Sequence, residues 1–257
     1  ARMFGAPIIQ HAEELSLTRG GAMNEGFVST SIGMPAMPRI AEELMIARDI
    51  AIVEYVGGRY HAAHVSTAGS VELIRQAKNK GLQVSCEVTP HHFTLTDEAV
   101  RGFDTNTKMN PPLRTEEDIE AIKAGLRDGT IDAIASDHAP HSFDEKEVEY
   151  LSAPFGIVGL ETAVALASTE LVETDILTWG DLAKKVSVNP RRILNLPAIR
   201  IQPQERANLT FIDPDFEWTV DVSKFKSKSR SSPFHGRKLK GKTVGILNNG
   251  ILHLTSH

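Results

Sequence analysis

Short apolar runs alternate with amphipathic stretches over the first 190 or so residues of the chain. Four apolar runs have the length of buried strands: 6–11, 60–65, 82–89 and 131–136. The stretch 38–56 repeats apolar residues at three- and four-residue steps, which predicts a helix with one buried face. Two further helices between the runs, 70–80 and 115–127, are predicted from the signals at their ends. Strands that alternate with helices in this way are typical of a parallel α/β sheet.

Local signals mark where the predicted helices begin and end. Gly57 and Gly81 follow the first and second helix and are plausible stop signals. Thr115 is a good N-cap for the third helix, with Asp118 in its acidic first turn. Two further helices are expected over 159–172 and 178–186.

The pattern changes after about Leu196. Short strand-like runs follow one another there, which predicts a small β module beside the main body: 208–212, 217–220, 243–247 and 250–254. We therefore divide the chain into a barrel portion, 1–196, and a β-rich module, 197–257. The segment 224–242 carries eight Lys and Arg residues but only Phe225 and Phe234 for base stacking. A solvated loop is favoured there over a phosphate or nucleic-acid patch.

Composition narrows the class of protein. The 257 residues are 41% hydrophobic and 24% charged, which are globular proportions. No apolar run approaches the roughly 18 residues of a membrane span, and no secretory signal is visible, so we expect no membrane partner. A net charge of −5 argues against bulk binding to nucleic acid. The single cysteine, Cys86, fits a reducing, cytoplasmic location and is expected to be a small core residue.

Polar residues gather where the predicted strands end. His11, His64, the pair His91–His92 and Asp137 each follow an apolar run. Since active sites of parallel α/β folds lie at the carboxyl ends of the strands, one common site is plausible. Imidazole and carboxylate are good Zn²⁺ ligands, so His11, His64 and Asp137 are candidate metal ligands. Their spacing is not a local metal motif, and a structural role for each histidine stays open.

Three loop segments carry further candidate chemistry, each with an open structural alternative. In 137–141, Asp137 could be both a ligand and a proton acceptor, or the segment could be a capped turn. In 108–114, Asn110 could present an amide to a substrate, or the two prolines could form a rigid connector. In 153–159, free backbone N–H groups could bind a carboxylate, or the segment could simply lead into a helix.

Taken together, these segments resemble dihydroorotases of the amidohydrolase superfamily. The matching stretches run in family order over residues 1 to about 165: HAE (11–13), HVST (64–67), EVTPHH (87–92), KMNPPLR (108–114), DHAPH (137–141) and APFGIVGLET (153–162). A weaker match covers 207–213. The KMNPPLR and DHAPH runs are the most specific, because hydantoinases and allantoinases differ at these two places.

The resemblance implies the C-terminal half of a (β/α)8 TIM-type barrel of the metal-dependent hydrolase kind, with a small flanking β module. It implies two Zn²⁺ ions, one bound by His11 and His64 and the other by Asp137, which would also shuttle a proton. Asn110, His141 and the backbone around Phe155 and Gly156 would hold the substrate. The implied reaction is the reversible conversion of L-dihydroorotate and water to N-carbamoyl-L-aspartate, in pyrimidine biosynthesis, by a homodimer.

Departures from the family pattern matter as well. The His-x-His pair of the first barrel strand, the arginine after it and the bridging metal ligand are absent, and Glu14 stands where the family often has Asp. We therefore expect this chain to be the C-terminal part of a longer protein. A catalytically inactive scaffold for a partner such as aspartate transcarbamoylase is the main alternative. The presence of His11, His64 and Asp137 favours the enzyme, and Asn110 and His141 disfavour a hydantoinase.

Overall fold

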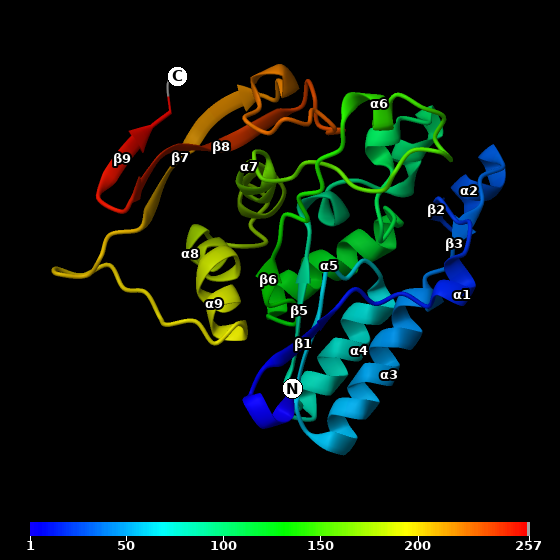
Figure 1. Cartoon of the computed structure of the whole chain (residues 1–257), viewed down its shortest axis with the longest axis horizontal. Helices are drawn as coiled ribbons and strands as arrows, with labels where there is room; N and C mark the ends of the chain where they lie inside the picture. The colour runs from blue at the N-terminus through cyan, green and yellow to red at the C-terminus, as the bar shows by residue number, and fades with distance from the viewer. Residues whose placement is uncertain (256–257) are drawn as a thin grey trace.

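The computed structural model describes residues 1–255, and Figure 1 shows their arrangement. The strands are β1 Pro7–Gln10, β2 Met23–Asn24, β3 Ala36–Met37, β4 Arg59–Ala62, β5 Val84–Val88, β6 Ala133–Ile134, β7 Leu209–Thr219, β8 Lys238–Asn248 and β9 Ile251–Leu254. The α-helices are α1 Leu15–Thr18, α2 Phe27–Ile32, α3 Ile40–Val56, α4 Ala68–Asn79, α5 Glu116–Asp128, α6 Phe143–Lys146, α7 Ala163–Ala167, α8 Trp179–Ala183 and α9 Asn189–Ile193. Single π-helical turns extend α7 over Ser168–Val172 and α8 over Lys184–Val188.

The main sheet is parallel, as the alternating pattern predicts. Its strand order is β1-β4-β5-β6, so the strands neighbour one another in the order of the chain. Register places Ile9 opposite His61 and Tyr60 opposite Val84. Each strand is shorter than the apolar run that predicts it, and the residues after the strands form loops that carry the histidines and Asp137.

Helices α3, α4 and α5 cover one face of this sheet and pack side by side (Figure 1). Alternate residues of β5 point into the interface, so Val84, Cys86 and Val88 are buried among the helices. The helix termini follow the sequence signals. The Thr115 hydroxyl and the Asp118 carboxylate form a reciprocal capping box at the start of α5, and Gly57 ends α3 with a positive φ of 64°.

The second sheet is antiparallel, in the order β7-β8-β9. The expectation of two short strands over 208–212 and 217–220 is wrong, because both belong to β7, which bulges between Asp213 and Glu217. A bulge keeps one strand continuous while shifting its register, so the sequence pattern breaks where the strand does not. Residues 238–242 of the predicted basic loop likewise lie in β8.

The β-rich part packs against the loops above the main sheet. Phe225, Phe234 and Leu239 share a buried cluster with Met109 and Ile157. The division at 196/197 remains a prediction, and the extended segment that follows α9 is visible in Figure 1. Within residues 1–255, no helix is long and apolar enough to cross a membrane.

Candidate active site

His11 and His64 meet at the carboxyl ends of β1 and β4. His11 Nδ1 lies 3.0 Å from His64 Nε2, and the two rings meet edge to face. The parallel pairing of β1 with β4 brings together residues that are 53 positions apart. His64 is held at a φ of 35° and Asp137, which follows β6, at 44°. Non-glycine residues in this left-handed region are uncommon and cluster at functional sites.

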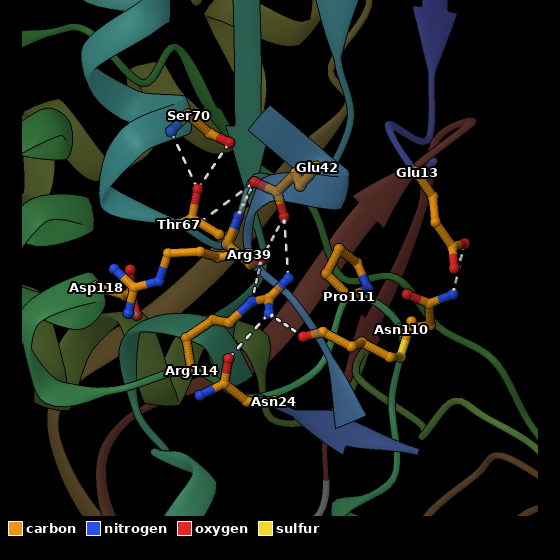
Figure 2. A network of polar contacts seen from close by, with 12 residues as sticks. Glu13, Asn24, Arg39, Glu42, Thr67, Ser70, Asn110, Pro111, Arg114 and Asp118 are labelled. Carbon is orange, nitrogen blue, oxygen red and sulfur yellow. Dashed lines mark hydrogen bonds and ion pairs between the residues drawn. The ribbon is translucent and has the colours of Figure 1, made fainter. Parts of the chain in front are cut away.

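Glu13 connects His11 to a third part of the chain. Its Oε2 atom lies 2.9 Å from His11 Nε2 and accepts a 2.9 Å hydrogen bond from Asn110 Nδ2 (Figure 2). Burial raises the pKa of Glu13, but hydrogen bonds from Thr18, His11 and Asn110 outweigh it, so the net pKa is lowered. Glu13 is therefore a carboxylate that accepts hydrogen bonds from His11 and from Asn110.

Glu13 was not among the site residues predicted from the sequence. The available signal was its spacing: in the run His11-Ala12-Glu13, positions i and i+2 of an extended segment point to the same side. The partner Asn110 lies 97 positions away, and no local pattern connects the two.

The His11 and His64 nitrogens are placed as two ligands of one metal ion would be, but a third ligand does not join them within residues 1–255. Two nitrogen ligands on one tetrahedral Zn²⁺, with bonds of about 2.0–2.1 Å, lie about 3.3 Å apart, close to the observed separation of His11 and His64. Glu13 faces the far nitrogen of His11, the usual way of orienting a ligating imidazole. His64 Nδ1 is buried and has no hydrogen-bond partner in the described part of the chain. Among residues 1–255, however, no three His, Cys, Asp or Glu side chains form a metal-binding group.

The environment of His64 keeps its imidazole neutral. Burial and the neighbouring His11 lower the pKa of His64, and the opposing effect of the Asp137 carboxylate is smaller. The neutral form is the one that binds metals. Asp137 is thus close enough to influence His64 electrostatically. The three candidate metal ligands His11, His64 and Asp137 follow three different strands, β1, β4 and β6.

The segment that follows Asp137 pairs with the 153–159 loop. His138 forms an isolated parallel bridge with Ile157, and its Nδ1 accepts a 3.2 Å hydrogen bond from the Gly159 N–H. His141 Nε2 lies 2.9 Å from the Phe155 carbonyl oxygen. Gly156 has a φ of 113°, and a Cβ there would lie 2.6 Å from that of Ala139, so only glycine allows this approach.

This pairing brings together the residues predicted to hold a substrate. The Gly156 N–H donates to the Lys108 carbonyl at 2.9 Å, two residues before Asn110. His141, Phe155, Gly156 and Asn110 therefore belong to one loop cluster. The Gly156 N–H and the Phe155 carbonyl already have protein partners in this arrangement, so a ligand would have to compete for them.

A buried polar network supports the turn after His64 (Figure 2). Glu42 of α3 accepts hydrogen bonds from the backbone N–H groups of Ser66 and Thr67, at 2.9 and 3.3 Å, and from the Ser66 hydroxyl. Arg114 pairs with Glu42 at 3.9 Å and donates to Asn24 and to the Met37 carbonyl. Both charged side chains are about 4% exposed. The network fixes the backbone that positions His64.

His91 and His92 differ in how the fold satisfies their ring nitrogens, because within residues 1–255 the buried Nε2 of His91 has no hydrogen-bond partner. Both are fully buried behind the strand ends, and burial lowers the pKa of His92 to about 3. His92 fills its hydrogen bonds with the Thr89 hydroxyl at 2.7 Å and the Pro111 carbonyl at 2.9 Å. Cys86 is also buried, and its pKa is raised to about 12 by burial, which confirms a core residue rather than a nucleophile.

A pocket of about 710 Å³ opens beside this cluster. Its wall includes Glu13, Asn110 and Phe155 together with Arg19 and Lys108. The volume suits a small organic ligand. Glu13, which lines the pocket, also faces the His11 imidazole, so the pocket adjoins the His11–His64 pair.

Several curated proteins named dihydroorotase are similar to this chain. The relative from Pelotomaculum thermopropionicum is 55% identical over 94% of the chain, and that from Syntrophus aciditrophicus is 51% identical over 95%. The chain covers 56% and 57% of their lengths, so it spans little more than half of the relatives it matches.

Solved structures show the same fold. An L-hydantoinase (dihydropyrimidinase) from Arthrobacter aurescens superposes with a TM-score of 0.86, at 26% identity, over 98% of this chain and 59% of its own. A dihydropyrimidinase from Brevibacillus agri gives 0.84 at 21% identity over 98% of this chain and 57% of its own, which supports the fold alone. The α/β fold of this chain is thus that of TIM-barrel hydrolases. A family model described as "Amidohydrolase family" matches residues 1–251. The chain belongs to the amidohydrolase family.

Proposed function

We propose that this chain supplies part of the active site of a zinc-dependent dihydroorotase, which interconverts L-dihydroorotate and N-carbamoyl-L-aspartate in pyrimidine biosynthesis. The observation that carries the proposal is the convergence of His11 and His64, with nitrogens 3.0 Å apart, beside Glu13 and Asn110. The relatives that match at 50% identity or more bear the name dihydroorotase. The remaining metal ligands would come from sequence outside this chain.

In this proposal His11 and His64 hold zinc through neutral imidazole nitrogens. Glu13 orients His11, and Glu42 holds the turn that carries His64. When bound, zinc supplies polarisation of the ring carbonyl and a lowered pKa of water, which a poor electrophile such as a cyclic amide needs.

Asp137 is the proposed proton carrier. Its carboxylate accepts the proton of the attacking water and delivers it to the ring nitrogen as the amide bond breaks. Asn110, His141 and the backbone around Phe155 and Gly156 are proposed to orient the substrate. Asn110 and Phe155 line the pocket, and His141 and Gly156 contact the lining residues Phe155 and Lys108, which supports this assignment.

The test joins this chain to the part of a dihydroorotase relative that the chain does not match. The chain is produced together with the segment of the Pelotomaculum thermopropionicum relative that precedes the matched region, as a single fusion. Hydrolysis of L-dihydroorotate is followed before chelation, after chelation and after zinc is restored, with hydantoin and dihydrouracil as control substrates.

Chelator-sensitive hydrolysis of dihydroorotate that returns with zinc supports the proposal. Faster turnover of hydantoin or dihydrouracil would instead indicate a different cyclic amidase. A folded, zinc-loaded fusion without activity on any of the three substrates would favour the inactive scaffold, for which binding of aspartate transcarbamoylase is the follow-up measurement.

A further inference from the structure

Two lysine side chains are buried in the loops beside the pocket. Lys108 Nζ donates to the carbonyl oxygens of Tyr150 and Leu151, both at 2.9 Å. Lys146 Nζ donates to the carbonyls of Thr105 and Pro154, at 3.1 and 2.8 Å. Their exposed fractions are 3% and 5%. Buried lysines of this kind are rare unless they are paired with an acid.

Carbonyl dipoles are the partners of both ammonium groups, and neither forms an ion pair with a carboxylate within residues 1–255. Burial lowers the pKa of Lys108. Burial and the charge of Lys108 lower the pKa of Lys146 to about 8, against a smaller opposing effect from Asp104. Each ammonium group donates to two carbonyl oxygens, which stabilises its charged form. Among residues 1–255, the loops thus hold two buried ammonium groups whose hydrogen-bond partners are carbonyl oxygens and not carboxylates.

Lys108 belongs to the wall of the pocket, and Lys146 lies behind that wall. Lys108 lines it directly, and its Nζ is 4.8 Å from the centre of the Phe155 ring, which lines the same wall. Lys146 holds the carbonyl of Pro154, the residue before Phe155. Glu13, the carboxylate of this pocket, already accepts hydrogen bonds from Asn110 and His11. Buried charges are screened by salt far less than surface charges.

We propose that Lys108 and Lys146 give this pocket a positive potential that selects an anionic ligand over a neutral ligand of the same shape. The two lysines are specificity-determining residues that act through their charge. Each ammonium group also holds two loop carbonyl oxygens, so the test has to separate this structural contribution from the effect of the charge. The proposal rests on the proposed function, because dihydroorotate carries a carboxylate.

The experiment compares an anion with its neutral isostere. In the fusion enzyme described above, KM is measured for L-dihydroorotate, and an inhibition constant is measured for L-dihydroorotamide, in which a carboxamide replaces the carboxylate. Lys108→Met and Lys146→Met are each expected to raise the KM for dihydroorotate about tenfold, which corresponds to about 1.4 kcal/mol. The inhibition constant for the neutral amide should stay within about twofold.

Two control variants separate charge from packing. Lys185→Met removes another buried lysine, whose Nζ donates to the Ile131 carbonyl at 2.6 Å, at the opposite end of β6 from the pocket. It should lower stability without changing the ratio of the two constants. Lys108→Arg keeps the charge and should keep most of the discrimination.

Each outcome supports or overturns the proposal. An unchanged ratio in both Met variants, or an equal change in Lys185→Met, overturns it while leaving dihydroorotase activity intact. If one Met variant does not fold, as judged by circular dichroism, the other decides by the same ratio. Lack of turnover by the unsubstituted fusion overturns the proposed function and this inference together.

Discussion

The most informative single perturbation is Glu42→Gln, because it removes one charge from the buried network that supports His64. The change is nearly isosteric, so packing in α3 is kept. The amide oxygen can still accept from the N–H groups of Ser66 and Thr67. The amide nitrogen, however, then faces Arg114, a guanidinium that is about 4% exposed and has lost its partner at 3.9 Å.

The expected cost follows from that unpaired charge. Breaking a buried ion pair by removing one partner typically costs about 3–5 kcal/mol, because the other charge stays buried without compensation. Burial lowers the pKa of Arg114, and the Glu42, Asp118 and Glu43 carboxylates oppose this effect, with Glu42 the largest of the three. Asp118 remains after the substitution, which favours the lower end of that range.

The assay is urea unfolding followed by circular dichroism, with the unsubstituted chain measured in parallel. We expect the midpoint to fall with little change in the slope m, because the folded surface is unchanged. Glu72→Gln is the matched control. Glu72 pairs with Arg75 on the surface with half of its side chain exposed, and an exposed pair contributes less than about 1 kcal/mol.

Equal losses in Glu42→Gln and Glu72→Gln would refute the reasoning, because they would mean that the Arg114–Glu42 pair is not held in a low-dielectric interior. The double variant Glu42→Gln with Arg114→Met separates the two contributions. It should recover part of the stability lost in Glu42→Gln, since the buried guanidinium is then gone as well.

Three further predictions concern the site and its pH dependence. In the fusion enzyme, Asp137→Asn should reduce turnover below detection with an unchanged circular dichroism spectrum; near-normal turnover would contradict the proton-carrier role. His141→Ala should raise KM at least tenfold more than it lowers kcat in steady-state kinetics, and an unchanged KM would argue against a substrate contact. The unfolding free energy of the chain should fall between pH 6.5 and pH 4, because the buried His92 stays neutral down to about pH 3 while the unfolded chain binds the proton there. His92 contributes a loss of about 1.4 kcal/mol per pH unit. The urea midpoint of the unsubstituted chain should therefore fall more steeply with falling pH than that of His92→Gln. An equal fall in both proteins would contradict this role of His92.

The fold class could be predicted from the sequence because its signals are local. The alternation of apolar runs with amphipathic stretches covers windows of 11 to 18 residues and needs no knowledge of distant contacts. The caps at Thr115 and Gly57 are encoded within one turn of their helices. Residues at the ends of β1 and β4 share one edge of the sheet by the geometry of parallel pairing, so the proximity of His11 and His64 also followed.

Other features were decided by tertiary packing alone. The pair β2–β3 and helix α2 lie in a polar, glycine-rich stretch without a clear period, and they are held there by Asn24, which bonds Asp97 and Arg114. The bulge in β7 breaks the alternation without ending the strand. Neither is visible in a window of the sequence, because each depends on partners more than 20 residues away.

The chemistry of the site divides in the same way. The sequence by itself determined which polar residues lie at the strand ends. Each apolar run marks a strand, so the polar residue that follows the run lies at the end of that strand. Only the tertiary structure decided that Glu13 meets Asn110, that Glu42 holds the turn after His64, and that Lys108 and Lys146 are buried against carbonyl oxygens. The physical reason is that a charged side chain has no preferred partner until packing removes water from it, and packing depends on the whole chain.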